Sequence, residues 1–279
     1  CLVAFVWIGD TWWQLFTAAV LAIVFTQIAF LGHDAAHRQI FVSGRWNDWI
    51  SLILGDLLVA WSDDLLEEGL RDASTAPATR RHYARMRREV TIGQFLDVAE
   101  ESAYVVAPVD THPDRALRVA SLKSARYSVQ HPLQLGATLA DADDEQYRAL
   151  AAFGHPIGLA FQLRDDVLGV FGDSAVTGKP VGDDLREGKR TLLIAYARAS
   201  LPAGALRIFD ELVGERDLTP EQVAHLQQTI VDTGALARVE SLITDWAAEA
   251  DRALRGARLG HGAVGDLRDL ARAATVRAA

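Results

Sequence analysis

Cysteine is almost absent from this sequence, and basic residues do not outnumber acidic ones. The one cysteine among the 279 residues is Cys1, which excludes an intrachain disulfide and favours a cytoplasmic location. The net charge of −9 argues against nucleic acid as a partner, because phosphate backbones bind to basic faces. The chain begins with Cys1 rather than Met and lacks the features of a signal peptide, so we expect a fragment or a mature chain.

Lysine is also scarce. Only three of the 28 basic residues are lysines, and they are Lys123, Lys179 and Lys189. Arginine covers the ordinary surface, so each lysine marks a place where a compact, rotatable ammonium is preferred over a planar guanidinium.

Alternating β-branched strands are not visible anywhere in the sequence. From about Trp61 onward, apolar and charged residues alternate at three- and four-residue spacing, which is typical of amphipathic helices. We therefore expect an all-α helical bundle over residues 62–279. The segments that follow this pattern are 82–106, 114–129, 144–171, 191–199, 220–233, 235–255 and 263–278.

The first sixty residues have a different composition. Residues 15–31, LFTAAVLAIVFTQIAFL, form an uncharged run about as long as a bilayer core requires, with tryptophans on both sides. Two glutamines and two threonines weaken this signal, so a buried helix of a bundle is the alternative. Contact with a membrane through residues 12–32, and a membrane-associated location, follow from the first interpretation only.

His33 and His37 are four residues apart, so on a helix both imidazoles point the same way and can share a metal ion. Such a pair is more often structural. The surrounding GHDAAHRQIF, followed by SGRWND, resembles the first histidine box of membrane fatty acid (acyl-CoA) desaturases. Those di-iron enzymes need further paired histidines, and this sequence contains no His-His dipeptide. The resemblance predicts a desaturase-like segment over residues 1–57 without a complete di-iron site.

Acids, glycines and lysines gather in RDDVLGVFGDSAVTGKPVGDDLREGKRT, residues 164–191. Gln162 and Asp166 lie four positions apart on one helix face, with Asp165 beside them. Adjacent carboxylates repel each other unless a cation lies between them, and Mg²⁺ accepts such oxygen ligands together with substrate phosphates. Two lysines follow in a loop whose glycines allow close backbone approach. The pattern predicts a Mg²⁺–diphosphate site, and the alternative is a solvated acidic helix end.

FQLRDDVLGVFGD followed by GKPVGDDLREGKRTLL resembles the second aspartate-rich region of the trans-isoprenyl diphosphate synthases (polyprenyl synthetases), particularly geranylgeranyl-type members from actinobacteria. MRREVTIGQFLD resembles the helix that carries a Gln and an Asp into the cavity of that family, here Gln94 and Asp97. SLKSARYSVQHPLQLGA resembles its Lys-Thr/Ser helix, here Lys123 and Ser124. The resemblance covers roughly residues 55–279 and predicts a helical bundle of the isoprenoid synthase type, as a domain over residues 58–279.

The resemblance implies a Mg²⁺-dependent head-to-tail condensation of an allylic diphosphate with isopentenyl diphosphate, which releases diphosphate. It also implies an apolar tunnel that shields a carbocation from water, and a homodimer. Carried over position by position, it implies metal binding by Asp165 and Asp166, with Asp97 and Asp173 acting through water; substrate binding by Gln94, Lys123, Ser124, Lys179 and Lys189; and catalytic roles for Lys123, Lys179 and Gln162.

Two departures from the family pattern affect these expectations. The second motif usually reads Asp-Asp-x-x-Asp, and its fifth position here is Gly169, which similar members also tolerate. The first aspartate-rich region and its arginine pair are absent from residues 1–54, and the acidic run at residues 63–67 comes too late to replace them. We therefore expect impaired turnover in a chain fused near residues 54–59, naturally or by a sequence-assembly error. The alternatives are a non-catalytic diphosphate-binding or dimer-partner module and a fragment of a membrane fatty acid desaturase.

Overall fold

A computed structural model of the chain describes residues 40, 42–177 and 180–275. Every regular element within these ranges is a helix, which confirms the expected all-α class. The chain divides into two compact units, Cys1–Ala73 and Ser74–Ala279. The expected boundary after residue 57 falls inside α3 (Gly44–Gly69), a helix of 26 residues in the first unit.

The uncharged run at residues 15–31 lies outside the described residues, as do His33 and His37. Among the helices that are described, none is both long enough and apolar enough to cross a membrane. Membrane contact through residues 12–32 and a metal ion on the two histidines therefore stay predictions.

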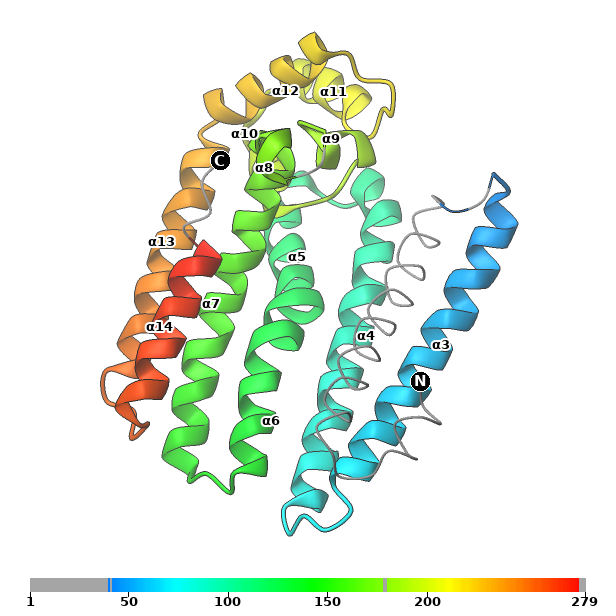
Figure 1. Ribbon diagram of the computed structural model, residues 1–279. Helices are drawn as coiled ribbons and strands as arrows, with labels where there is room; N and C mark the ends of the chain where they lie inside the picture. The colour runs from blue at the N-terminus through cyan, green and yellow to red at the C-terminus, as the bar shows by residue number, and fades with distance from the viewer. Residues whose placement is uncertain (1–39, 41, 178–179, 276–279) are drawn as a thin grey trace. The chain divides into compact units, whose positions relative to one another are not determined.

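Long helices lie side by side in the second unit (Figure 1). One rod consists of α5, η2 and α6, which follow one another without a break, and it packs between α4 and α7. On its other side α7 packs against α13, and α14 contacts both of these helices. The bounds are α4 Ala76–Val106, η1 Val109–Thr111, α5 His112–Val119, η2 Ala120–Gln130, α6 His131–Leu139, α7 Asp144–Phe171, α13 Ala235–Leu254 and α14 His261–Thr275.

Shorter helices gather at one end of this bundle (Figure 1). They follow α7 in the chain, and the first of them, α8 and α9, lie within the acidic and glycine-rich stretch of residues 164–191. Their bounds are α8 Ser174–Thr177, α9 Asp183–Glu187, α10 Leu192–Ser200, α11 Ala203–Leu212 and α12 Pro220–Asp232.

The predicted helix over residues 144–171 coincides with α7. Asp143 explains where α7 begins, because its carboxylate accepts from the backbone N–H groups of Glu145 and Gln146 while the Gln146 side chain accepts from the Asp143 N–H. The helix predicted over residues 114–129 differs from the structure: α5 continues there into the π-helix η2. Apolar spacing shows that such a segment is helical, but it does not reveal a switch to i→i+5 hydrogen bonds.

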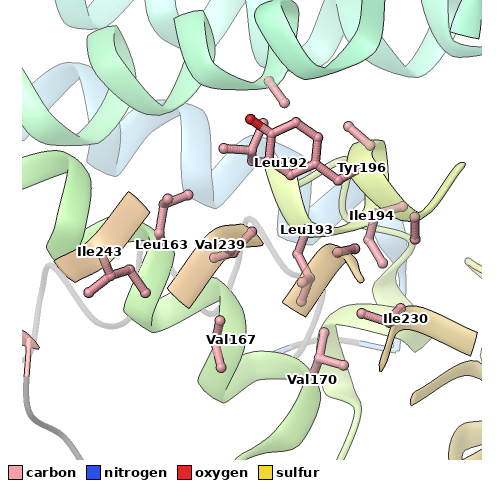
Figure 2. Packing of buried hydrophobic residues seen from close by; sticks show 14 of the residues in the cluster. Leu163, Val167, Val170, Leu192, Leu193, Ile194, Tyr196, Ile230, Val239 and Ile243 are labelled. Atoms are coloured by element: carbon pink, nitrogen blue, oxygen red, sulfur yellow. The ribbon is translucent and has the colours of Figure 1, made fainter. Parts of the chain in front are cut away.

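The hydrophobic core fixes one face of α7. Leu163, Val167 and Val170 follow one another at helical spacing and are almost completely buried against α10 and α13, as Figure 2 shows. Arg164, on the adjacent face of α7, fixes the rotation of this helix about its axis. Its guanidinium donates two hydrogen bonds of 2.7 Å to the Glu240 carboxylate and one of 3.0 Å to the Thr275 carbonyl.

A buried polar chain joins α4, α6 and α7. The Tyr147 hydroxyl lies 2.9 Å from His82 Nδ1, and His82 Nε2 lies 3.0 Å from His131 Nδ1. His131 Nε2 in turn lies 3.0 Å from a Glu89 carboxylate oxygen. Burial lowers the pKa of His82 to about 4, so this imidazole is neutral near pH 7.

Candidate functional site

The two aspartates of the predicted metal motif occupy different environments. Asp166 is only 6% exposed on α7, whereas Asp165 beside it is exposed to solvent. Gln162 donates a hydrogen bond of 2.8 Å from Nε2 to Asp166 Oδ1, as their four-residue spacing predicts. Burial, together with the nearby carboxylates of Asp184 and Asp165, raises the pKa of Asp166 to about 7, although the hydrogen bond from Gln162 and the charge of Lys189 oppose this rise. A cation bound here would stabilise the ionised carboxylate.

A short helix, α9, brings a further carboxylate and a lysine to this place. Gly182 and Gly188 bracket α9 with φ angles of 71° and 68°, a conformation that side chains rarely tolerate. Lys189 follows directly, and its ammonium lies 2.5 Å from Asp184 Oδ1 and 3.1 Å from Glu187 Oε2. Asp184 is 6% exposed, so this ion pair is largely shielded on the carboxylate side.

Gly169 provides the space that the Asp184 carboxylate occupies. A Cβ atom on Gly169 would lie 2.1 Å from Asp184 Oδ2 and 2.3 Å from its Cγ. Gly169 stands one helical turn after Asp166 on α7, at the fifth position of the aspartate motif. Asp184 therefore places a carboxylate against the position where the family usually has its third aspartate. Sequence reasoning did not assign Asp184, because the contact joins residues fifteen positions apart across a loop.

The carboxylates of α9 also lie close to one another. One ligand atom each from Asp183, Asp184 and Glu187 lies within 4.8 Å of the others. Among the described residues this is the group of three or more His, Cys, Asp or Glu side chains close enough to hold a metal ion. The acidic DDLRE stretch was the sequence signal for this group, although spacing alone assigns it no role.

A second set of predicted residues lies on α4 and η2. The Lys123 ammonium pairs with the Asp97 carboxylate, and both side chains are somewhat more than a third exposed. Gln94 is exposed on α4, one turn before Asp97, and Ser124 is half-buried beside Lys123. The structure therefore joins two of the predicted residues that lie 26 positions apart in the sequence.

The two remaining predicted residues are Asp173 and Lys179. Asp173 lies where α8 begins, and its Oδ1 accepts a hydrogen bond of 2.9 Å from the Ala175 backbone N–H. Lys179 lies outside the described residues. The proposed roles of both residues stay predictions.

Two arginines connect the loop after Lys189 to the end of α4. The guanidinium carbons of Arg190 and Arg198 each lie 3.6 Å from the centre of the Tyr104 ring. Arg198 also donates two hydrogen bonds, of 2.7 and 2.8 Å, to the Asp210 carboxylate on α11. This buried cluster fixes the residue that directly follows Lys189.

The second unit is thus an all-α bundle in which Lys123 pairs with Asp97 and Lys189 pairs with Asp184. A family model described as polyprenyl synthetase matches residues 32–230, and the chain therefore belongs to the polyprenyl synthetase family. The match begins within the segment expected to resemble desaturases, and that resemblance finds no support in the comparisons.

The chain is similar to several curated proteins. It is 39% identical over 166 residues to a geranylgeranyl diphosphate synthase of Mycobacterium tuberculosis, which covers 58% of this chain and 45% of the relative. It is 32% identical over 198 residues to a geranylfarnesyl diphosphate synthase of Aeropyrum pernix, covering 70% of this chain and 59% of that protein. The chain thus spans about half the length of the curated relatives it matches.

Solved structures share the fold. A geranylgeranyl pyrophosphate synthase of Corynebacterium glutamicum, complexed with isoprenyl diphosphate and magnesium, aligns with a TM-score of 0.78 at 35% identity. The alignment covers 90% of this chain and 69% of that one. This likeness confirms the expected helical bundle of the isoprenoid synthase type.

Proposed function

We propose that the described residues of the second unit form a Mg²⁺-dependent binding site for an isoprenyl diphosphate. The observation that carries this proposal is the buried carboxylate of Asp166, which lies beside other acids and within reach of the Lys189 charge. Carboxylate oxygens are the ligands that Mg²⁺ prefers, and the cost of burying them is offset when a divalent cation binds. The residues present therefore fit this metal ion.

In this proposal Asp165 and Asp166 hold the metal ion, and Gln162 orients Asp166 through its 2.8 Å hydrogen bond. When bound, Mg²⁺ supplies positive charge that makes diphosphate a better leaving group. Lys123 and Lys189 bind the outer diphosphate oxygens. Each ammonium is already held by a carboxylate, Asp97 or Asp184, so it exchanges one anionic partner for another without a large movement. Gln94 and Ser124 complete the substrate contacts from α4 and η2.

The reaction that this site would serve is the head-to-tail condensation of an allylic diphosphate with isopentenyl diphosphate. The allylic carbon–oxygen bond breaks, the double bond of isopentenyl diphosphate attacks the resulting cation, and a proton leaves with the released diphosphate. We propose that turnover is impaired in this chain, because the first aspartate-rich region is missing from the sequence. Catalytic groups that act as a unit lose most of their effect when one part is absent.

A second candidate is a non-catalytic module that binds diphosphates or pairs with a complete subunit. It is favoured by the absence of an Asp-Asp-x-x-Asp motif with a following arginine pair from residues 1–54, because binding through Asp166, Lys123 and Lys189 does not need that motif. A homodimer remains a prediction under either candidate.

Calorimetric titration with inorganic pyrophosphate, in the presence and absence of Mg²⁺, tests the site. We expect Mg²⁺-dependent binding that Asp166→Asn weakens by at least tenfold. Asp245→Asn serves as the matched control, because Asp245 is exposed on α13, and it should leave the affinity unchanged. Binding that is equally strong in Asp166→Asn would contradict the assignment of the site.

Incubation of the protein with Mg²⁺, an allylic diphosphate and radiolabelled isopentenyl diphosphate separates the two candidates. Binding accompanied by product, even at a low rate, favours the prenyltransferase. Binding without any product favours the non-catalytic module.

A further inference from the structure

The segment that carries Lys123 has an uncommon backbone. η2 is an eleven-residue π-helix, Ala120–Gln130, inserted between α5 and α6. In a π-helix the hydrogen bonds run from i to i+5, so each turn is wider than an α-turn. Most π segments are single turns, and many lie at functional sites. A π-helix of this length therefore needs neighbours that hold it in place.

Three glycines on the neighbouring helices meet the backbone of η2. A Cβ atom on Gly93 of α4 would lie 2.5 Å from the Lys123 backbone nitrogen and 2.8 Å from the Leu122 carbonyl carbon. On α7, a Cβ on Gly158 would lie 2.6 Å from the Ala125 carbonyl oxygen, and one on Gly154 would lie 2.8 Å from Gln130 Cα. All of these contacts are with backbone atoms, which cannot move aside as a flexible side chain can.

The contact at Gly93 concerns the candidate diphosphate ligand directly. The Lys123 N–H group rests against Gly93, and the Lys123 ammonium pairs with Asp97, one helical turn further along α4. α4 thus fixes both ends of this lysine. A Cβ at position 93 would have to move the Lys123 backbone by about 1 Å to reach ordinary van der Waals contact, and displacements of that size are sufficient to disturb a preorganised site.

We propose that Gly93 and Gly158 are positioning residues for Lys123. They clamp η2 from opposite sides, α4 and α7, and so set the place from which the Lys123 ammonium meets a diphosphate. This proposal rests on the proposed function, because it takes the role of Lys123 in diphosphate binding from there.

A double-mutant cycle tests the clamp. Gly93→Ala, Lys123→Ala and the double variant are titrated with inorganic pyrophosphate in the presence of Mg²⁺, after far-UV circular dichroism has shown that each is folded. We expect each single substitution to weaken binding about tenfold, and the double variant to bind no more weakly than Lys123→Ala, because the effect of Gly93 acts through Lys123. A general loss of stability would not produce this non-additivity.

Two further alanine variants serve as controls. Gly136→Ala adds a Cβ to α6 where no described atom of another element lies within 4 Å, and it should leave the affinity unchanged. Gly154→Ala crowds η2 at Gln130, seven residues from Lys123, so it should lower stability but keep the affinity. If Gly93→Ala does not fold, Gly158→Ala replaces it in the same cycle.

The possible outcomes separate this proposal from the proposed function. If Lys123→Ala binds pyrophosphate as well as the natural chain, the assignment of Lys123 is wrong, and the clamp falls with it. If Lys123→Ala loses affinity while Gly93→Ala keeps it, or if the two losses simply add, the clamp alone is refuted.

Discussion

Replacing Gly169 by aspartate restores the usual Asp-Asp-x-x-Asp motif in the sequence, but we expect this variant to be less stable than the natural chain. The reason is the position of Asp184, whose Oδ2 would lie 2.1 Å from a Cβ at position 169. Asp184 cannot easily turn away, because its carboxylate is buried and paired with Lys189 at 2.5 Å. A second carboxylate would have to enter a space that is already filled.

The size of the effect follows from two contributions. Inserting extra atoms into a packed site costs about 1–3 kcal/mol. Two carboxylates about 4 Å apart repel each other by about 4 kcal/mol at an effective dielectric constant of about 20, and Lys189 offsets part of this. We therefore expect the free energy of unfolding of Gly169→Asp to be about 3–6 kcal/mol lower than that of the natural chain, a large share of the roughly 5–15 kcal/mol of a typical domain.

Urea unfolding at pH 7.5 without Mg²⁺ measures this loss, with Gly169→Ala as the control that adds bulk but no charge. Gly169→Ala should lose about 1–3 kcal/mol, and Gly169→Asp clearly more. Adding Mg²⁺ should narrow the difference, because a cation shared by the carboxylates reduces their repulsion. If Gly169→Asp is as stable as the natural chain without Mg²⁺, Asp184 does not occupy this space and the reasoning is wrong.

Two other predictions concern the polar interior. Burial lowers the pKa of His82 from 6.5 to about 4, so the unfolded chain takes up this proton first as the pH falls. The neutral His82 should therefore contribute stability above pH 6.5 that is lost as the pH falls from 6.5 to 4, about 2 kcal/mol of it by pH 5. The urea midpoint should fall between pH 7.5 and pH 5, and this fall should be smaller in His82→Gln than in the natural chain. The Tyr104 hydroxyl makes no hydrogen bond of ordinary geometry within the described part of the chain, so Tyr104→Phe should unfold at about the same temperature or higher. Tyr104→Leu, which loses both stacked guanidinium contacts, should be less stable by about 1–4 kcal/mol, and equal melting temperatures for the two variants would contradict the role of the ring.

The helical class and most helix positions followed from the sequence, because apolar residues at three- and four-residue spacing must face a core. α7 shows this most clearly: its predicted bounds, residues 144–171, are those of the structure. η2 shows the limit of the method. η2 packs closely against Gly93, Gly154 and Gly158 on two other helices, and a contact of this kind cannot be read from the spacing within the segment itself.

The candidate site was predictable only in part for a similar reason. The four-residue spacing of Gln162 and Asp166 was sufficient to place them together, because both residues lie on one helix. The approach of Asp184 to Gly169 was not predictable, because it depends on how the loop folds α9 back onto α7. The sequence shows which residues carry positive and negative charge, but which carboxylate each lysine pairs with is set by the tertiary structure.

Moving the carboxylate from α9 to α7 is the most direct test of this pairing. In the double variant Gly169→Asp with Asp184→Ala, one carboxylate again occupies the space next to Asp166, now from position 169. The clash is removed, and Lys189, whose side chain is 40% exposed, keeps Glu187 at 3.1 Å and contact with water. We expect the double variant to recover most of the stability that Gly169→Asp loses, so that the two substitutions couple by about 3–6 kcal/mol in the free energy of unfolding. It should also bind Mg²⁺ with pyrophosphate more tightly than Asp184→Ala alone. Additive losses of stability would mean that positions 169 and 184 do not share one space, and the explanation offered for the glycine in the motif would then fail.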